Sequence, residues 1–399
     1  MAISTRGPGN LAPQAPRRSL INDPNVRAIF FQILVLGGVV LLGWYLVSNV
    51  LENLARQNIA TGFSFLDREA SFAIGEAMIP YSPASSYSQA LLVGFLNTIK
   101  VAVLGIILAT VLGTVIGIAR LSSNFLVAKL ASIYVEVIRN VPVLLQLFFW
   151  YAVISESLPQ PRQALNPIPG VFLSNRGMKF PSLADDPIWT WVGLALVAAM
   201  VGVWLLARWA RKRQEATGQQ FPVVLASIGL LLALPLLTWV VGGAPTALDV
   251  PVLQGFNFRG GITISPEFAA LLMGLVIYTA GFIAEIVRSG IRAVNWGQTE
   301  AASALGLHRG EVLRLVVLPQ ALRIIVPPTT SQYLNLTKNS SLAVAIGYPD
   351  LVSVANTTLN QTGQAIEAVS IMMAVYLTIS LGISLFMNWY NTRIALVER

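Results

Sequence analysis

Five ionisable side chains stand inside stretches of sequence that are otherwise apolar enough to cross a membrane. They are Lys100, Glu136, Arg139, Glu285 and Lys338. A charge inside a bilayer raises the free energy by several kcal/mol unless it is paired, so these residues are candidates for contact with a charged molecule that crosses the membrane. A structural ion pair is the competing explanation for each of them.

The densest polar cluster in these stretches surrounds Lys338, which is followed by Asn339 and Ser340 and preceded by Asn335. A zwitterionic molecule needs a cation or a helix N-terminus for its carboxylate and an acceptor for its ammonium group. Lys338 and the two asparagines could serve the carboxylate, and a glutamate the ammonium group. Alternatively, Lys338 pairs with a membrane glutamate and supports the assembly.

Two further helical faces carry candidate residues. Tyr278 and Glu285 are seven residues apart and share a face, as do Glu136 and Arg139, which are three apart. Both glutamates lie within about three turns of the cytosolic ends of their helices, so they fit a gate as well as a binding site. Glu136 and Arg139 fit a self-neutralising pair equally well. Lys100 is better explained as a side chain that extends toward the membrane surface.

Several chemistries are excluded by what the sequence lacks. It contains no cysteine, which excludes disulfides, thiolate nucleophiles and cysteine metal sites. Its single histidine, His308, is too few for a histidine metal site and fits an ordinary contact residue. No Gly-Lys pair occurs, so there is no P-loop and any ATP hydrolysis must come from another chain. Without a Gly-x-Ser-x-Gly motif or an aspartate in an apolar stretch, a membrane enzyme is disfavoured.

The composition indicates a polytopic membrane protein. Of 399 residues, 55% are hydrophobic and 11% charged, and the mean hydropathy is +0.68. Charged residues make up about 25% of ordinary globular proteins. The pattern predicts about eight helical spans, of which the seventh has the least certain bounds because Pro327 and Pro328 interrupt it. The spans are 27–51, 89–119, 131–154, 188–207, 222–241, 268–291, 321–346 and 368–390.

Most lysines and arginines fall in the segments that are cytosolic if the N-terminus lies inside. We therefore expect both termini in the cytosol, with 1–26 as a disordered tail that has no signal peptide. The net charge of +8 then reflects membrane insertion and not a nucleic-acid partner. We expect the external segment 52–88 to lie on the membrane surface, and the proline-rich segment 155–187 to be irregular and extended.

One cytosolic segment has a distinctive spacing. Read physically, it is a helix rich in small residues, a glycine suited to a tight turn, and a second amphipathic helix ended by proline. The alanines let the first helix lie close to a partner, and its glutamate is expected in the first turn, where a carboxylate favours the helix N-terminus. The residues are Glu300-Ala301-Ala302, Gly306, Val316 and Leu318-Pro319.

This spacing resembles the hallmark loop of the integral membrane (permease) subunits of bacterial ABC importers: Glu-Ala-Ala, three residues, Gly, nine residues, Ile, one residue, Leu-Pro. Only Val316 departs from it. Other segments resemble permeases for polar amino acids, and the first helix, the inserted fourth and fifth helices and Asn58-Ile59-Ala60 resemble their Q-type subunit. Those other segments are Asn97-Thr98, Arg139-Asn140-Val141-Pro142, 278–288 and 331–343.

The resemblance implies an all-α, type I importer permease core over 89–392 in the bacterial inner membrane. The extra helix and external loop occupy 27–88, the inserted helix pair about 188–241, and the cytosolic coupling loop 293–320, with tails at 1–26 and 393–399. It also implies four kinds of partner: an ABC ATPase that binds ATP and Mg, a second permease of the M type, a periplasmic amino acid-binding protein, and polar L-amino acids as substrates. The chain itself is expected to carry no cofactor and no catalytic site.

An ion-coupled secondary amino acid transporter is the alternative. That class needs acidic residues or broken-helix oxygens near the middle of the membrane, and often an internal repeat. The sequence shows no internal repeat, and the spacing of the coupling loop favours the ABC importer.

Overall fold

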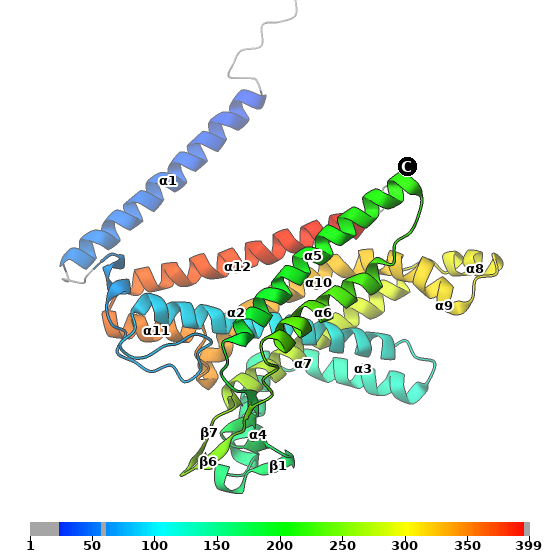
Figure 1. The fold of residues 1–399 in the computed structure, drawn as a ribbon. Coiled ribbons are helices and arrows are strands. Elements are labelled where there is room, and N and C mark those ends of the chain that lie inside the picture. The colour runs from blue at the N-terminus through cyan, green and yellow to red at the C-terminus, as the bar shows by residue number, and fades with distance from the viewer. Residues whose placement is uncertain (1–23, 57–60, 395–399) are drawn as a thin grey trace, which may run out of the picture.

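The computed structural model describes residues 24–56 and 61–394 and is predominantly helical (Figure 1). The expected terminal tails fall largely outside these residues, as does Asn58-Ile59-Ala60. The helices are α1 (Pro24–Arg56), α2 (Tyr87–Ala119), α3 (Phe125–Asn140), α4 (Val143–Ser157), α5 (Ile188–Thr217), α6 (Val223–Val241), α7 (Pro266–Arg292), α8 (Trp296–Ala304), α9 (Arg309–Glu311), α10 (Leu318–Asn339), α11 (Leu351–Thr362) and α12 (Ala365–Ile394).

Seven helices in the described chain are long and apolar enough to cross a membrane, and a bent pair raises the number to eight. This agrees with the eight helical spans that the sequence predicts. The bent pair is α3 and α4, which meet at 106°. The prediction of one continuous span over 131–154 is wrong, because the residue before Pro142 is driven into an extended conformation and ends α3. Gln146 donates to the carbonyls of Ile138 and Val141 at 3.0 Å and so satisfies two groups at the break.

The core forms around α7, which packs against α2, α3, α4 and α10. Glycines on α2 allow α7 to approach closely. A Cβ at Gly113 would lie 2.7 Å from the Cβ of Ile283, and one at Gly117 would lie 2.7 Å from the carbonyl oxygen of Ala284. Small residues serve the same purpose in membrane helix pairs generally.

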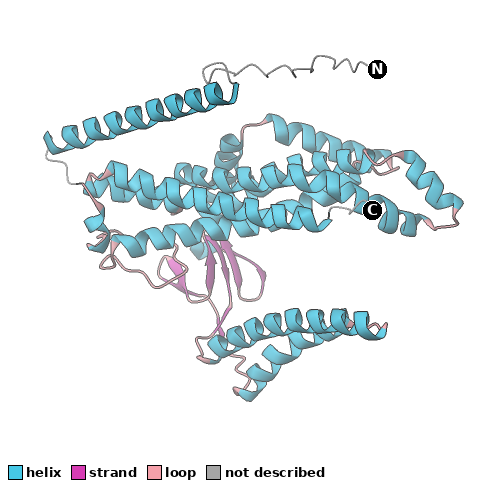
Figure 2. Cartoon of the chain, turned by 90° about the horizontal axis from the view of Figure 1, so that it is seen from above, coloured by secondary structure: helices cyan, strands magenta, loops and turns pink. Residues whose placement is uncertain are grey.

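The inserted pair, α5 and α6, packs chiefly against itself and lies apart from the main bundle (Figure 2). Short antiparallel strands in the two flanking loops connect it to the core, and α4 and α7 adjoin them (Figure 1). The expectation of an irregular segment over 155–187 is therefore wrong, since its extended residues pair across two loops. The strands are β1 (Leu165–Ile168), β2 (Val171–Ser174), β3 (Gly177–Phe180), β4 (Ser182–Leu183), β5 (Leu248–Asp249), β6 (Val252–Gln254), β7 (Asn257–Arg259) and β8 (Ile262–Ile264).

The segment before α2 is a packed cap. Its 3₁₀ turn η2 (Phe63–Asp67) buries Phe65 completely against Tyr87, with ring centroids 5.9 Å apart. Farther along, Glu76 forms an ion pair with Lys100 and accepts a 2.7 Å hydrogen bond from Ser265 on α7. The apolar residues of this loop therefore pack largely on protein and not on the membrane surface, and Lys100 is paired instead of extending into water.

A buried carboxyl group marks the turn after α10. A 3₁₀ segment, η5 (Ser340–Ile346), follows α10, and Asp350 then caps α11 by accepting from the Ser353 amide at 2.9 Å. Tyr376 of α12 donates to the other carboxylate oxygen of Asp350 at 3.3 Å. Burial is the main influence on this group and raises the pKa of Asp350 from 3.8 to about 7.

Candidate functional site: a coupling loop and a polar cavity

The coupling loop has the expected turn. Helix α8 ends at Ala304, Gly306 adopts φ 84°, and α9 begins at Arg309 after a His308 N-cap. Glu311 accepts from the His308 amide at 2.9 Å, so His308 is part of a cap. The left-handed φ explains why glycine occupies position 306, because a Cβ would strain the backbone there.

The end of the loop differs from the expectation. Pro319 does not end a helix; it lies in the first turn of α10, which extends to Asn339 through Pro327 and Pro328. A π-helical segment, η4 (Val312–Val317), precedes α10 directly. The helical run that begins at Arg309 therefore continues through Pro319 into the membrane helix without a break, and the π turn with its wider hydrogen-bond spacing lies just before the proline that cannot donate.

Two details of α8 also need correction. Glu300 is the fifth residue of the helix and not in its first turn, and its carboxylate accepts from the Trp296 indole at 2.9 Å. Of the two small residues, Ala301 is exposed, whereas Ala302 is buried within the loop and 5% exposed. Ala302 therefore lets α8 pack on η4, and of the two alanines only Ala301 is exposed.

Sequence reasoning missed the apolar tip of this loop. Leu305 is 83% exposed and Trp296 is 71% exposed, so the ends of α8 present two large apolar side chains. The sequence pattern that indicates this tip is a leucine and a tryptophan in a segment of otherwise small and polar residues. Exposed apolar groups of this size on a short helix suit docking into a groove.

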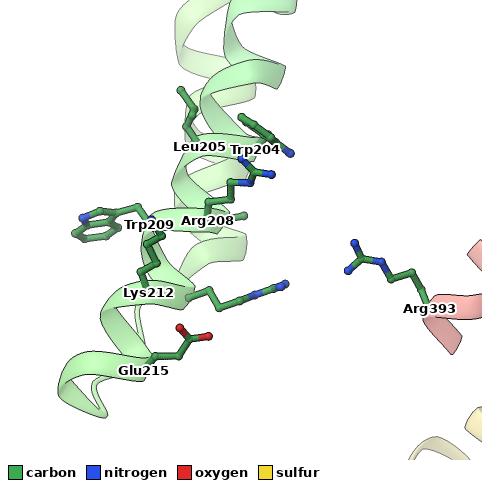
Figure 3. Close-up of a pocket in the computed structure, with 9 residues that line it drawn as sticks. Trp204, Leu205, Arg208, Trp209, Lys212, Glu215 and Arg393 are labelled. Carbon is green, nitrogen blue, oxygen red and sulfur yellow. The ribbon is translucent and has the colours of Figure 1, made fainter. Parts of the chain in front are cut away.

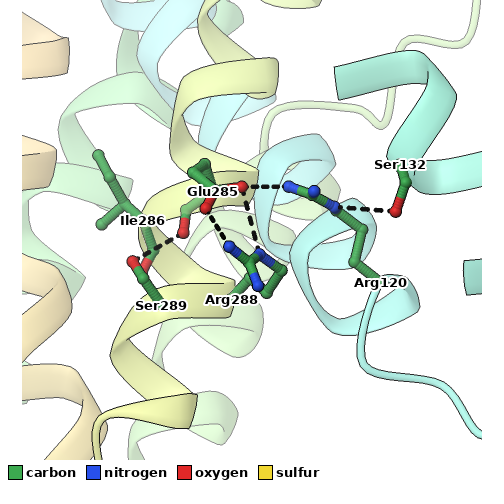
Figure 4. Close-up of polar contacts among 6 residues, drawn as sticks. All are labelled: Arg120, Ser132, Glu285, Ile286, Arg288 and Ser289. Carbon is green, nitrogen blue, oxygen red and sulfur yellow. Dashed lines mark hydrogen bonds and ion pairs between the residues drawn. The ribbon is translucent and has the colours of Figure 1, made fainter. Parts of the chain in front are cut away.

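Glu285 lies at the centre of an arginine cluster (Figure 4). It forms ion pairs with Arg120, just after α2, and with Arg288, one turn along α7. Arg120 also donates to Ser132 of α3 at 3.3 Å. The cluster therefore links three segments, and Glu285 is not the partner of Lys338.

Glu136 and Arg139 do not form the self-neutralising pair that the sequence allowed. In the described structure neither carries an ion pair, and both side chains are exposed near the end of α3. Arg139 lies over the ring of Phe282 on α7, 5.0 Å from the centroid. The Glu136 carbonyl accepts from Asn140 at 2.6 Å.

A polar cavity of about 280 Å³ lies between α7 and α10. It brings together three of the predicted residues, Tyr278, Asn335 and Asn339. Gln332 and Thr279 also line it, and Phe282 contributes the ring on which Arg139 lies. Sequence reasoning missed Gln332, although the i+3 and i+7 spacing to Asn335 and Asn339 places it on their face.

Lys338 and Ser340 lie elsewhere. Lys338 is exposed and lines a separate groove with Ser341 and residues of α12. It stands about 100° around the helix from Asn339, which explains the separation. Ser340 is buried, and its hydroxyl donates to the Thr337 carbonyl at 2.7 Å. The predicted cluster therefore divides between a cavity and a groove.

The chain is similar to known transport proteins. The family model described as "Binding-protein-dependent transport system inner membrane component" matches residues 204–396. The General L-amino acid transport system permease protein AapQ of Rhizobium johnstonii is 56% identical over 384 residues, which is 96% of this chain and 96% of that protein. The putative amino-acid ABC transporter permease protein YhdX of Escherichia coli is 52% identical, covering 94% and 96%.

A third relative is the glutamate/glutamine/aspartate/asparagine transport system permease protein BztB of Rhodobacter capsulatus. It is 42% identical and covers 95% of this chain and 96% of that protein. Since such relatives extend over nearly the whole length, the chain belongs to the family of binding-protein-dependent transport system inner membrane components, the non-catalytic, multi-pass permease subunits of ABC importers.

Proposed function

We propose that this permease conducts polar L-amino acids inward as one half of a membrane pathway driven by a separate ABC ATPase, which binds ATP and Mg. The coupling loop is the observation that carries this. Its Glu300 to Pro319 spacing is combined with an apolar tip at Leu305 and a rigid continuation into α10. Closure of the ATPase would move α8, and α10 would transmit the movement to the cavity it lines.

The polar cavity suits an amino acid. Tyr278, Gln332, Asn335 and Asn339 supply neutral donors and acceptors for its carboxylate and ammonium groups. Arg139 lies over the ring of Phe282, which lines the cavity, and it forms no ion pair within the described residues. The names of AapQ and BztB, which specify general L-amino acids and four acidic or amide amino acids, point to the same substrate class.

Glu285 is better suited to a gate. Its bonds to Arg120 and Arg288 hold α2, α7 and, through Ser132, α3 together near the cytosolic end. Glu136 is exposed on the last turn of α3, where a second permease chain could cover it. We propose that the second permease chain is of the M type, because the Q-type features of the present chain imply an unlike partner.

We propose an orientation with both termini and α8 in the cytosol and the β strands outside, where a periplasmic amino acid-binding protein would deliver substrate. Single cysteines in this cysteine-free chain test it. A cysteine at Asn257 should react with an impermeant thiol reagent added outside, and cysteines at Gln214 or Gln298 should be protected. The reverse pattern would refute this orientation.

Uptake in energised vesicles tests the mode of transport. With the binding protein, both permeases and the ATPase present, radiolabelled glutamine uptake should stop when ATP is depleted while the proton gradient is intact. Loss of uptake on adding an uncoupler at constant ATP would instead support the ion-coupled alternative. A single cysteine at Leu305 should also cross-link to the ATPase, whereas one at Gln214, on the same proposed face, should not.

A further inference from the structure

The cytosolic end of the inserted hairpin forms a cavity with the last turn of α12 (Figure 3). Its volume is about 790 Å³. Its walls combine basic groups with an apolar surface and come from two segments far apart in the sequence. The lining residues are Trp204, Leu205, Ala207, Arg208, Trp209, Arg211, Lys212, Glu215 and Arg393.

The charges of this cavity are unbalanced. Four cations, Arg208, Arg211, Lys212 and Arg393, face a single carboxylate, Glu215. None of the four forms an ion pair within residues 24–56 and 61–394. Because like charges brought together repel one another, a bound anion would stabilise this arrangement. An insertion signal alone needs basic residues on one side of the membrane, but it does not need them to converge on one cavity.

The aromatic residues hold the arginines in place. Arg208 lies 3.8 Å from the centroid of the Trp204 ring, and Arg393 lies 5.5 Å from that of Trp389. Stacking on a ring fixes a guanidinium and leaves the N–H groups at its edge directed outward. In Figure 3 the Arg393 side chain extends toward the helix that carries Arg208 and Lys212.

The same tryptophans give the depth of the cavity in the membrane. Trp204, Trp209 and Trp389 lie where α5 and α12 change from apolar to basic sequence, which is typical of the headgroup level. Above this level α5 exposes Val197, Val201 and Leu205. A ligand with an anionic head and apolar chains matches both parts of this surface, whereas a free phosphate matches only the head.

We propose that this cavity binds an anionic phospholipid of the cytosolic leaflet, with its phosphate between Arg208, Arg211, Lys212 and Arg393 and its acyl chains along α5. The assignment to the cytosolic leaflet rests on the orientation proposed above. The bound lipid would connect the hairpin to α12, since the hairpin is otherwise held mainly through its external strands. Basic pockets between helices on the cytosolic side bind anionic headgroups in the same way.

Native mass spectrometry of the assembled transporter tests this. The complex is delipidated in detergent and titrated with phosphatidylglycerol, phosphatidylethanolamine or inorganic phosphate. We expect one tightly retained phosphatidylglycerol. The combined change Arg208→Gln, Arg211→Gln, Lys212→Gln and Arg393→Gln should weaken this binding by roughly tenfold or more, since each basic residue near a membrane surface adds to anionic lipid attraction.

A matched control removes charge from the same proposed face outside the cavity. Lys129→Gln with Arg213→Gln should leave phosphatidylglycerol retention unchanged, and Arg211→Lys with Arg393→Lys should retain most of it. If the quadruple variant assembles in poor yield, Arg393→Gln alone should still weaken binding. The proposal is overturned if phosphatidylethanolamine is retained equally, if millimolar phosphate displaces the lipid, or if the quadruple or Arg393→Gln complex binds as the parent does. Failure here would leave ATP-driven uptake untouched, so the proposed transport function is tested separately.

Discussion

The α7-centred core and the α5–α6 hairpin differ in how much of their membrane helices is buried inside the chain. In the apolar window of α7, 61% of residues are buried inside the chain, against 6% in each of α5 and α6. All three windows are similarly hydrophobic. Hydropathy therefore shows that a helix can enter a membrane, but it does not show whether the helix packs on protein there.

Glycine substitutions should have the largest effect on assembly, and that effect should differ between the core and the hairpin. Gly113→Val places a side chain within 2.7 Å of Ile283, so α2 and α7 must separate, and we expect no assembled transporter. Gly193→Val in α5 and Gly229→Val in α6 meet nothing within 4 Å and should assemble normally. Complex yield after affinity purification measures this. Equal yields for all three variants would contradict the packing described for the core.

Two glycines of the coupling loop allow a matched pair of variants that tests the effect of backbone strain alone. A Cβ added at Gly306 or at Gly310 would meet nothing within 4 Å, but only Gly306 has a positive φ, of 84°. Gly306→Val should strain the turn by about 1–3 kcal/mol and reduce uptake strongly at normal membrane levels. Gly310→Val should reduce it far less. Similar uptake by the two variants would show that the turn geometry is unimportant.

The arginine cluster tests how much a charged contact contributes to the stability of the core. Glu285→Gln leaves Arg120 and Arg288 without their carboxylate. Because the side chains of Glu285 and Arg120 are 25% and 11% exposed, we expect a loss of about 1–3 kcal/mol, less than for a fully buried pair. Thermal unfolding of the purified complex measures it. Adding Arg120→Gln should recover part of the loss, and an additive double variant would show that the two residues do not interact.

Cavity and groove variants should separate the substrate path from its surroundings. Asn335→Leu or Asn339→Leu removes a neutral hydrogen-bonding group, worth about 0.5–1.5 kcal/mol, and should raise the KM for uptake by roughly two- to tenfold. Lys338→Met, on the neighbouring groove, should change the KM less. A larger change in KM for Lys338→Met than for the asparagine variants would place Lys338 on the substrate path and exclude the cavity as the binding site.

The smallest expected effect concerns pH. Because the pKa of Asp350 is raised from 3.8 to about 7, the native state binds its proton more tightly than the unfolded chain does. Its contribution to stability is therefore largest below about pH 4 and declines as pH rises to about 7. Asp350→Asn keeps an N-cap and should remove this decline. Thermal midpoints at pH 5 and pH 8 measure it, and an equal decline in the variant would contradict the assignment.

Local rules of the chain accounted for the membrane spans, the turn at Gly306 and the spacing of the coupling loop. These depend on hydropathy, φ preferences and helix geometry, which act over a few neighbouring residues. The break at Pro142 was within reach of the same rules, since residue 141 precedes a proline. The continuation of the helix through Pro319 could not be predicted in this way, because a proline can end a helix or begin one. Which of the two occurs depends on the π turn before it.

The partners of the charged residues were decided only by the tertiary structure. The sequence left open whether Lys338 pairs with Glu285 or Glu136, and it favoured an unpaired Lys100. The fold instead pairs Glu285 with two arginines and Lys100 with Glu76 of the cap, and it places Lys338 on a groove. The strands of the two loops that flank the inserted helix hairpin likewise pair with one another. The sequence by itself determined which residues are charged, apolar or flexible; which of them meet depends on contacts between distant segments, which no local pattern encodes.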